Sequence, residues 1–199
     1  ISYAVLSFYL KEKKQQLVFK FTVLAGAGFV ILSSPDLFFR QLLLRGIKVT
    51  HSRDTQFGNI TTAEYGGESS TYYDQRLLTY NDDAAEREED IHYAMLQVDK
   101  PETVLLISGS VNSHLKEIVK YPVKKVVYVE RDPALARIEN HEPLSGLTEL
   151  VIENDDAYSF VRKTSEKFDA AIVLLPPPSS LLLNRYYTLE FFSSVKELL

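Results

Sequence analysis

The chain has 199 residues, 45% of them hydrophobic and 25% charged, a composition that fits one globular domain with an appendage and excludes a disordered chain. Its net charge of −5, from 22 basic and 27 acidic residues, argues against a nucleic-acid surface, because phosphate binding needs clustered Lys and Arg. It has no cysteine, which excludes disulfides and thiolate ligands or nucleophiles. Its four histidines lack the paired spacing of a metal motif, so no metal site is predicted.

The first 45 residues differ from the rest by their apolar runs. Residues 1–10 are almost wholly apolar, and residues 17–34 carry Lys20 as their only charge. A helix that crosses about 30 Å of hydrocarbon needs about 20 apolar residues. The second run therefore fits either a membrane span or a buried amphipathic helix, and its hydropathy favours the span. Because the chain starts inside an apolar run, we expect it to be part of a longer membrane protein.

Residues 55–80 are predicted to form antiparallel β structure, as a hairpin or small meander. Two runs rich in β-branched and aromatic residues are separated there by Gly66 and Gly67. A helix is predicted over Asp82–Val98, with acidic residues in its first turn. These acids could attract a polyamine, although a solvated acidic turn explains them without a ligand.

From residue 104 onward the pattern alternates strand and helix, which indicates a parallel sheet flanked by helices. The predicted strands are Val104–Ile107, Val126–Glu130, Leu150–Glu153 and Ala170–Leu175. The predicted helices are Ser113–Tyr121, Pro133–Asn140 and Ala157–Lys163, and Pro133 is a favourable first helical residue. Ligands of such folds bind at the carboxyl ends of the strands.

The segment 104–132 has the layout of a nucleotide-binding βαβ unit. Gly109 lies in the turn after the first strand, where the backbone must approach a ligand, and Glu130 follows 21 positions later, where an acid binds ribose hydroxyls. Alternatively, Glu130 caps the following helix together with Asp132. Serines at 108, 110 and 113 stand where glycines are usual, and their Cβ atoms narrow the space for a ligand.

Five segments carry a resemblance to a known family. In chain order they are DTQFGNI (54–60), EEDIHYAML (88–96), VERDP (129–133), DDAYSF (155–160) and PPPSSLLLNRYYTLEFF (176–192). Together they make residues 53–199 resemble the spermidine synthase-like aminopropyltransferases, most closely the bacterial members fused to a membrane region. In that family a small β domain precedes a Rossmann-like, methyltransferase-type fold. The enzymes move an aminopropyl group from decarboxylated S-adenosylmethionine to putrescine.

The apolar runs and the resemblance together predict an α/β fold in three parts. These are an apolar helical segment and candidate membrane region over residues 1–45, a small antiparallel β domain over 46–82, and a Rossmann-like parallel sheet over 83–199. The resemblance also implies roles for individual residues.

Glu130 would bind the ribose of an adenosyl ligand, Asp156 would contact the adenine amine, and Gln56 would lie near the same site. With Gly109 and Asp155 these form the predicted cofactor-binding set. Helix capping before Ala157 is the alternative role for Asp155 or Asp156.

The chain departs from the family at its catalytic acids. The family's acid in the G-G-G-D-G turn is Val111 here, and the two acids of its D-S-S-D-P segment become Leu174 and Pro177. A primary amine with a pKa near 10 is protonated at pH 7 and needs a carboxylate to accept its proton. Burying a cationic amine beside apolar groups is also costly. No catalytic residue is therefore predicted, and we expect aminopropyl transfer to be weak or absent.

These observations predict a spermidine synthase-like domain at the bacterial inner membrane that has lost catalysis and serves as a binding or assembly module. An adenosyl ligand, a polyamine and a membrane are the predicted partners, with a homodimer or a membrane complex as the assembly. The alternatives are an active aminopropyltransferase that uses other acids such as Asp155, an S-adenosylmethionine-dependent methyltransferase, and a purely structural subunit. Tyr186 and Tyr187 either line a pocket or belong to the core, and a nucleophile at Ser179 or Ser180 is weakly indicated.

Overall fold

The computed structural model describes most of the chain in five stretches. These are residues 13–32, 39–42, 46–80, 84–138 and 146–199. The chain divides into two compact units, Ile1–Val49 and Thr50–Leu199.

The described part of the first unit consists mainly of a 20-residue helix, α2 (Lys13–Leu32). The helix begins at Lys13, so a lysine- and glutamine-rich turn and Lys20 occupy part of its length. No helix within the described residues is long and apolar enough to cross a membrane. The predicted span over residues 17–34, and the membrane location inferred from it, are therefore wrong.

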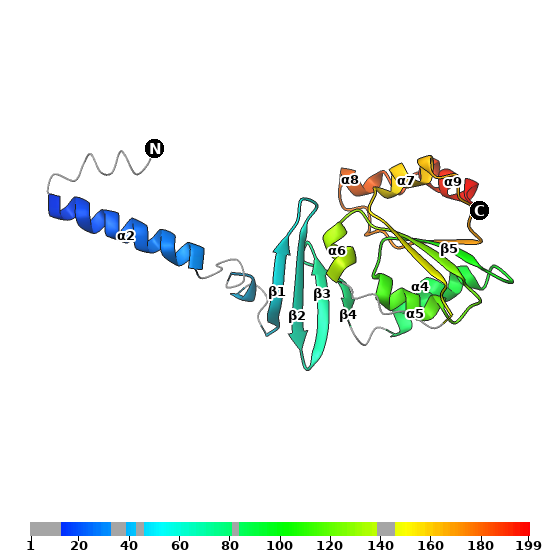
Figure 1. The fold of residues 1–199 in the computed structure, drawn as a ribbon, viewed down its shortest axis with the longest axis horizontal. Coiled ribbons are helices and arrows are strands. Elements are labelled where there is room, and N and C mark those ends of the chain that lie inside the picture. The colour runs from blue at the N-terminus through cyan, green and yellow to red at the C-terminus, as the bar shows by residue number, and fades with distance from the viewer. Residues whose placement is uncertain (1–12, 33–38, 43–45, 81–83, 139–145) are drawn as a thin grey trace. The chain divides into compact units, whose positions relative to one another are not determined.

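The second unit begins with a four-stranded sheet in the order β1-β2-β3-β4, drawn in cyan to blue-green in Figure 1. Its strands are β1 (Lys48–Asp54), β2 (Asn59–Tyr65), β3 (Glu68–Tyr73) and β4 (Arg76–Tyr80). The β2–β3 and β3–β4 pairs are antiparallel. Gly66 and Gly67 form the predicted turn with positive φ, and Asp74 and Gln75 form a second turn of the same kind. The predicted meander is confirmed, and β1 adds a strand that was not predicted.

The rest of the unit is built on a parallel sheet with the strand order β7-β6-β5-β8. The strands are β5 (Thr103–Ile107), β6 (Lys125–Val129), β7 (Glu149–Glu153) and β8 (Ala170–Val173). The two central strands, β5 and β6, are apolar and buried almost throughout, as expected for a sheet covered on both faces. This order places the turn after β5 beside the end of β6, where Glu130 follows.

Helices cover both faces of this sheet. They are α4 (Ala84–Met95), α5 (Val111–Ile118), α6 (Pro133–Ile138), α7 (Ala157–Lys163), α8 (Leu181–Asn184) and α9 (Leu189–Glu197). Figure 1 shows α4 and α5 on one side of the strands and α7 and α9 on the other.

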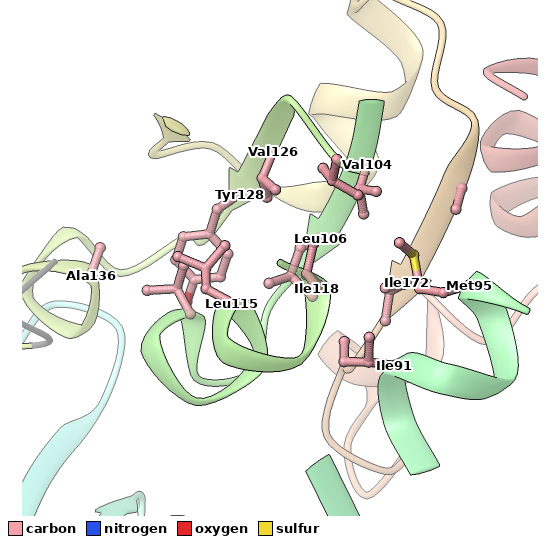
Figure 2. Close-up of a cluster of buried hydrophobic side chains, with 13 residues drawn as sticks. Ile91, Met95, Val104, Leu106, Leu115, Ile118, Val126, Tyr128, Ala136 and Ile172 are labelled. Atoms are coloured by element: carbon pink, nitrogen blue, oxygen red, sulfur yellow. The ribbon is translucent and has the colours of Figure 1, made fainter. Parts of the chain in front are cut away.

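Each side has its own hydrophobic core. The core under α4 and α5 includes Ile91, Met95, Leu115 and Tyr128, which Figure 2 shows converging on the sheet. The opposite core is centred on Phe191 of α9, which is fully buried. The predicted α/β class, an antiparallel sheet followed by a parallel one, is confirmed.

Candidate functional site

The turn after β5 is held in a shape that only a few residues adopt. Ser108 and Gly109 both have positive φ, at +61° and +78°, which is unusual for a serine. The Ser108 N–H donates to the Val129 carbonyl at 2.9 Å, and the Tyr128 hydroxyl donates to the Gly109 carbonyl at 2.8 Å. Ser110 then begins helix α5 as its N-cap. The serine in place of a glycine therefore does not prevent the sharp turn that the sequence pattern requires.

Glu130 lies at the carboxyl end of β6 with its side chain buried. Its Oε2 accepts a hydrogen bond from the Ser108 hydroxyl at 3.1 Å, and its Oε1 accepts one from the Asp132 N–H at 2.9 Å. Burial raises the pKa of Glu130, against the lowering effect of these hydrogen bonds. A carboxylate oxygen has two lone pairs, so both oxygens can accept a further hydroxyl, such as those of a ribose.

The helix that follows Glu130 is capped by a different acid. Asp132 Oδ1 accepts a hydrogen bond from the Ala134 N–H at 2.9 Å, directly before Pro133 opens α6. Glu130 takes part in the same region, because its Oε1 accepts from the Asp132 N–H while its Oε2 accepts from the Ser108 hydroxyl. Asp132 therefore supplies the side-chain cap of α6, and Glu130 links the residue before the helix to the turn after β5.

The space above Gly109 is filled by an apolar side chain. A Cβ atom placed on Gly109 would lie 2.9 Å from Leu174 Cδ1 and 3.3 Å from His114 Cε1. Leu174 directly follows β8, and the side chain of Val111 is fully buried in the core under α5. Val111 and Leu174 are two of the three positions at which the family resemblance implies an acid. Both are thus apolar, and Leu174 covers the turn at Gly109.

The loop before β2 contacts the same end of β6. The Thr55 hydroxyl donates to Asp132 Oδ2 at 2.6 Å, and the Arg131 guanidinium lies 4.9 Å from the centre of the Phe57 ring. Gln56, between these two contacts, is exposed. The loop therefore brings Gln56 to the strand end at which Glu130 lies.

Asp155 and Asp156 follow β7, whose end is hydrogen-bonded to that of β6 through Glu130 N–H and the Glu153 carbonyl at 3.0 Å. Asp156 is the N-cap of α7, so one of the two acids caps as expected. Its Oδ2 also accepts hydrogen bonds from the Arg185 guanidinium and the Tyr186 hydroxyl. Asp155 is the more exposed of the pair, with 36% of its side chain accessible against 20% for Asp156.

Burial acts to raise the pKa of Asp155, but hydrogen bonds from the Asp156 N–H and Lys163 outweigh it, so the pKa is lowered. Asp155 therefore stays ionised at neutral pH, and its charge is paired with the Lys163 ammonium at 3.4 Å.

Sequence reasoning missed the contact of Arg185 and Tyr186 with Asp156. The Tyr186 ring packs edge-on against Phe191, with centroids 5.6 Å apart, so Tyr186 is a core aromatic whose hydroxyl reaches the site. Burial and the hydrogen bond to Asp156 raise the pKa of Tyr186 to about 12. Tyr187 donates instead to the Leu175 and Pro176 carbonyls, at 2.8 and 2.9 Å. Both tyrosines hold the segment after β8 in place.

A group of possible metal ligands lies away from this edge. Glu88, His92 and Glu117 each place one ligand atom within 4.8 Å of the others. Lys120 forms ion pairs with both glutamates. A lysine ammonium thus already balances their charge, and the group carries no argument for a metal.

The comparisons with known proteins agree with this geometry. The family described as spermine/spermidine synthase domain matches residues 84–199. A polyamine aminopropyltransferase of Oceanobacillus iheyensis is 31% identical over 184 residues, 87% of this chain and 36% of its own length. Polyamine aminopropyltransferase 2 of Aquifex aeolicus is 27% identical over 185 residues, 88% of this chain and 38% of its own. The chain thus spans little more than a third of the length of these two curated relatives.

The fold comparison points the same way. A spermidine synthase solved in complex with the transition state analogue AdoDATO superposes with a TM-score of 0.66 at 22% identity, covering 76% of this chain and 55% of that one. The matched family accounts for more than half of the chain and includes the whole parallel sheet. The chain belongs to the spermine/spermidine synthase domain family.

Proposed function

We propose that this chain carries the donor site of a polyamine aminopropyltransferase, which binds decarboxylated S-adenosylmethionine and transfers its aminopropyl group to a polyamine. The observation that carries the proposal is the buried Glu130 carboxyl group facing the positive-φ turn at Ser108 and Gly109. An acid at this strand end and a glycine-containing turn beside it are two parts that an adenosyl ligand needs. Leu174, which fills the space above Gly109, has to move for such a ligand to approach the turn. The names of the curated relatives support the same activity.

The proposed reaction is a displacement at carbon. The amine nitrogen of the acceptor forms a bond to the terminal carbon of the donor's aminopropyl chain, and the bond from that carbon to the sulfonium sulfur breaks. The sulfur leaves as the neutral thioether of methylthioadenosine, and the new ammonium releases a proton. Since no redox change or metal is required, the protein has to hold the two reactants in line and handle one proton.

Removal of the proton from the acceptor amine is the step for which this chain lacks the acids that the family resemblance implies. Leu174 and Val111 offer no acceptor, and a general base is worth roughly 10²- to 10⁴-fold in rate. Asp155 is ion-paired with Lys163, and its lowered pKa makes it a poor proton acceptor. We therefore expect transfer to be slow, with the proton passing to solvent. From the missing acids, the sequence predicts that catalysis is lost. Here we propose instead that transfer takes place at a reduced rate.

The test is a mass balance of the reaction. Purified protein is incubated with decarboxylated S-adenosylmethionine and putrescine, and methylthioadenosine and spermidine are quantified over hours. Equal amounts of both products, absent with Glu130→Ala, are expected. Intact S-adenosylmethionine in parallel reactions would reveal methyl transfer.

A second function, ligand binding without transfer, is favoured by the apolar Val111 and Leu174 at positions where the family resemblance implies acids. It predicts that the donor binds and that neither product forms. Absence of both binding and products would overturn the proposal.

A further inference from the structure

One buried acid near the donor site has no part in the proposed reaction. Asp132 lies two residues after Glu130, and its side chain is 1% exposed. Its Oδ2 accepts hydrogen bonds from the Thr55 hydroxyl at 2.6 Å and the Tyr73 hydroxyl at 3.3 Å. These partners precede it by 77 and 59 positions in the chain. Asp132 therefore joins the end of β6 to the antiparallel sheet.

The Thr55 hydroxyl organises the loop that carries Gln56. Its oxygen accepts hydrogen bonds from the backbone N–H groups of Phe57 and Gly58, both at 3.1 Å. The Thr55 N–H donates to the Gly58 carbonyl at 2.8 Å, which closes the loop. The hydroxyl has a single proton and two acceptors within reach, Asp132 Oδ2 at 2.6 Å and the Gly58 carbonyl at 2.9 Å. The shorter contact, to a carboxylate, is the stronger of the two. The loop thus has an internal structure and one polar attachment to the end of β6.

Tyr73 supports the loop from the side of β3. A Cβ atom on Gly58 would lie 2.9 Å from Tyr73 Cζ and 2.8 Å from the Asp74 carboxyl oxygens, so the glycine permits a very close approach. The Asn59 N–H also donates to Asp74 Oδ1 at 2.8 Å. Burial, together with the negative charge of Asp132, raises the pKa of Tyr73. Its hydroxyl therefore remains a donor to Asp132 at any physiological pH.

Asp132 also contacts Glu130, the acid that we propose to bind the ribose hydroxyls. Its backbone N–H donates to Glu130 Oε1 at 2.9 Å, while its side chain holds Thr55 and Tyr73. From this geometry we infer that Asp132 is a positioning residue of the donor site. It fixes the loop that places Gln56 against a bound adenosyl donor and, through the same short segment, orients Glu130. The inference rests on the proposed function, because it assumes that Glu130 and Gln56 meet one ligand.

The first variant for the test is Asp132→Asn, which keeps the shape of the side chain. Its amide nitrogen would place a third donor against the Thr55 oxygen, which already accepts two, so the loop must shift. We expect the dissociation constant of methylthioadenosine, measured by calorimetry, to rise about 10-fold or more. Thr55→Val and Tyr73→Phe remove one hydroxyl each and should act in the same direction. Tyr72→Phe is the matched control, since that hydroxyl is not part of the contacts with Asp132.

A purely structural role is separated from positioning by a double-mutant cycle. Gln56→Ala should weaken binding in the unsubstituted protein and have little further effect when combined with Asp132→Asn. Equal losses in the two backgrounds would overturn the inference, as would unchanged affinity in Asp132→Asn, Thr55→Val and Tyr73→Phe.

The proposed function and the inference fail in distinguishable ways. If the unsubstituted protein binds methylthioadenosine and Glu130→Ala does not, the donor site stands even when Asp132 proves unimportant. If the unsubstituted protein binds no adenosyl ligand, the proposed function is wrong and the inference falls with it.

Discussion

The two halves of the carboxyl edge of the parallel sheet differ sharply in chemistry. At the end of β6, Glu130 and Asp132 are buried acids with several hydrogen-bond partners each. At the end of β5 and β8, Val111 and Leu174 are apolar, and Leu174 lies against Gly109. Burying a carboxylate costs free energy of folding unless hydrogen bonds or opposite charges compensate it, whereas burying an apolar side chain is favourable. In the proposed function, this difference separates donor binding, at the end of β6, from proton removal, for which the ends of β5 and β8 offer no acid.

The largest effect should come from the acid that faces the turn. Glu130→Ala removes the only charged partner proposed for the ribose hydroxyls, so methylthioadenosine affinity should fall at least about 100-fold. Glu153→Ala is the control, because Glu153 ends the neighbouring strand with an exposed side chain. Calorimetric titration of both variants checks this. Comparable losses in the two would remove the distinction between the buried acid and an ordinary acid of this edge.

Restoring an acid to the apolar half should be the next largest change. Leu174→Asp places a carboxyl group beside Gly109 and frees space over the turn, so the rate of aminopropyl transfer should rise about 10- to 100-fold. Spermidine formed per hour is the measurement, and Leu182→Asp on α8, whose side chain is half exposed, is the control. A transfer rate that stays at the unsubstituted level would mean that the apolar half does not limit the reaction.

Burial of Glu130, in the polar half of the edge, should make the free energy of unfolding depend on pH. Burial raises the pKa of Glu130, so between its unfolded pKa near 4.3 and the raised value the native state binds more protons than the unfolded one. Stability contributed by Glu130 therefore falls as pH rises through that window.

Glu130→Gln removes this dependence. It should be more stable than the unsubstituted protein at pH 7, and the difference should shrink as the pH falls toward the unfolded pKa of glutamate. Urea unfolding at several pH values tests this, and a difference that does not change with pH would contradict the role of burial.

The smallest expected effect concerns the segment after β8. Tyr186→Phe removes a buried hydroxyl that donates to Asp156 and should cost about 0.5 to 1 kcal/mol of unfolding free energy. Tyr187→Phe, whose hydroxyl is exposed, should cost less. Denaturant titration at pH 7 compares them. A larger cost for Tyr187 would show that the carbonyl contacts of Leu175 and Pro176, and not Asp156, hold this segment.

Much of the fold follows from local sequence. The apolar run at Val126–Val129 predicts a buried parallel strand, and Gly66 and Gly67 predict their turn because both need positive φ. Strand β1 was missed because its residues, KVTHSRD, lack an apolar alternation, and most of its side chains are exposed. The turn at Asp74 and Gln75 was missed because positive φ is not the default for either residue type.

The candidate site was predictable at Gly109 and Glu130, since both belong to one local βαβ unit. The contact of Leu174 with Gly109 depends on how β8 pairs with β5, which no spacing reveals. The hydrogen bond from Thr55 to Asp132 joins residues 77 positions apart. The N-cap role of Asp156 follows from a local signal and was predicted. Its other partners, Arg185 and Tyr186, directly follow α8 and were not predicted.

The most direct test is a crystal structure of the protein with methylthioadenosine bound. We predict that the ribose hydroxyls lie within hydrogen-bond distance of the Glu130 carboxyl oxygens, with Gln56 beside the nucleoside and Leu174 moved off Gly109. A nucleoside bound elsewhere, or one bound while Glu130 keeps Ser108 and Asp132 as its only partners, would contradict the assignment of the donor site.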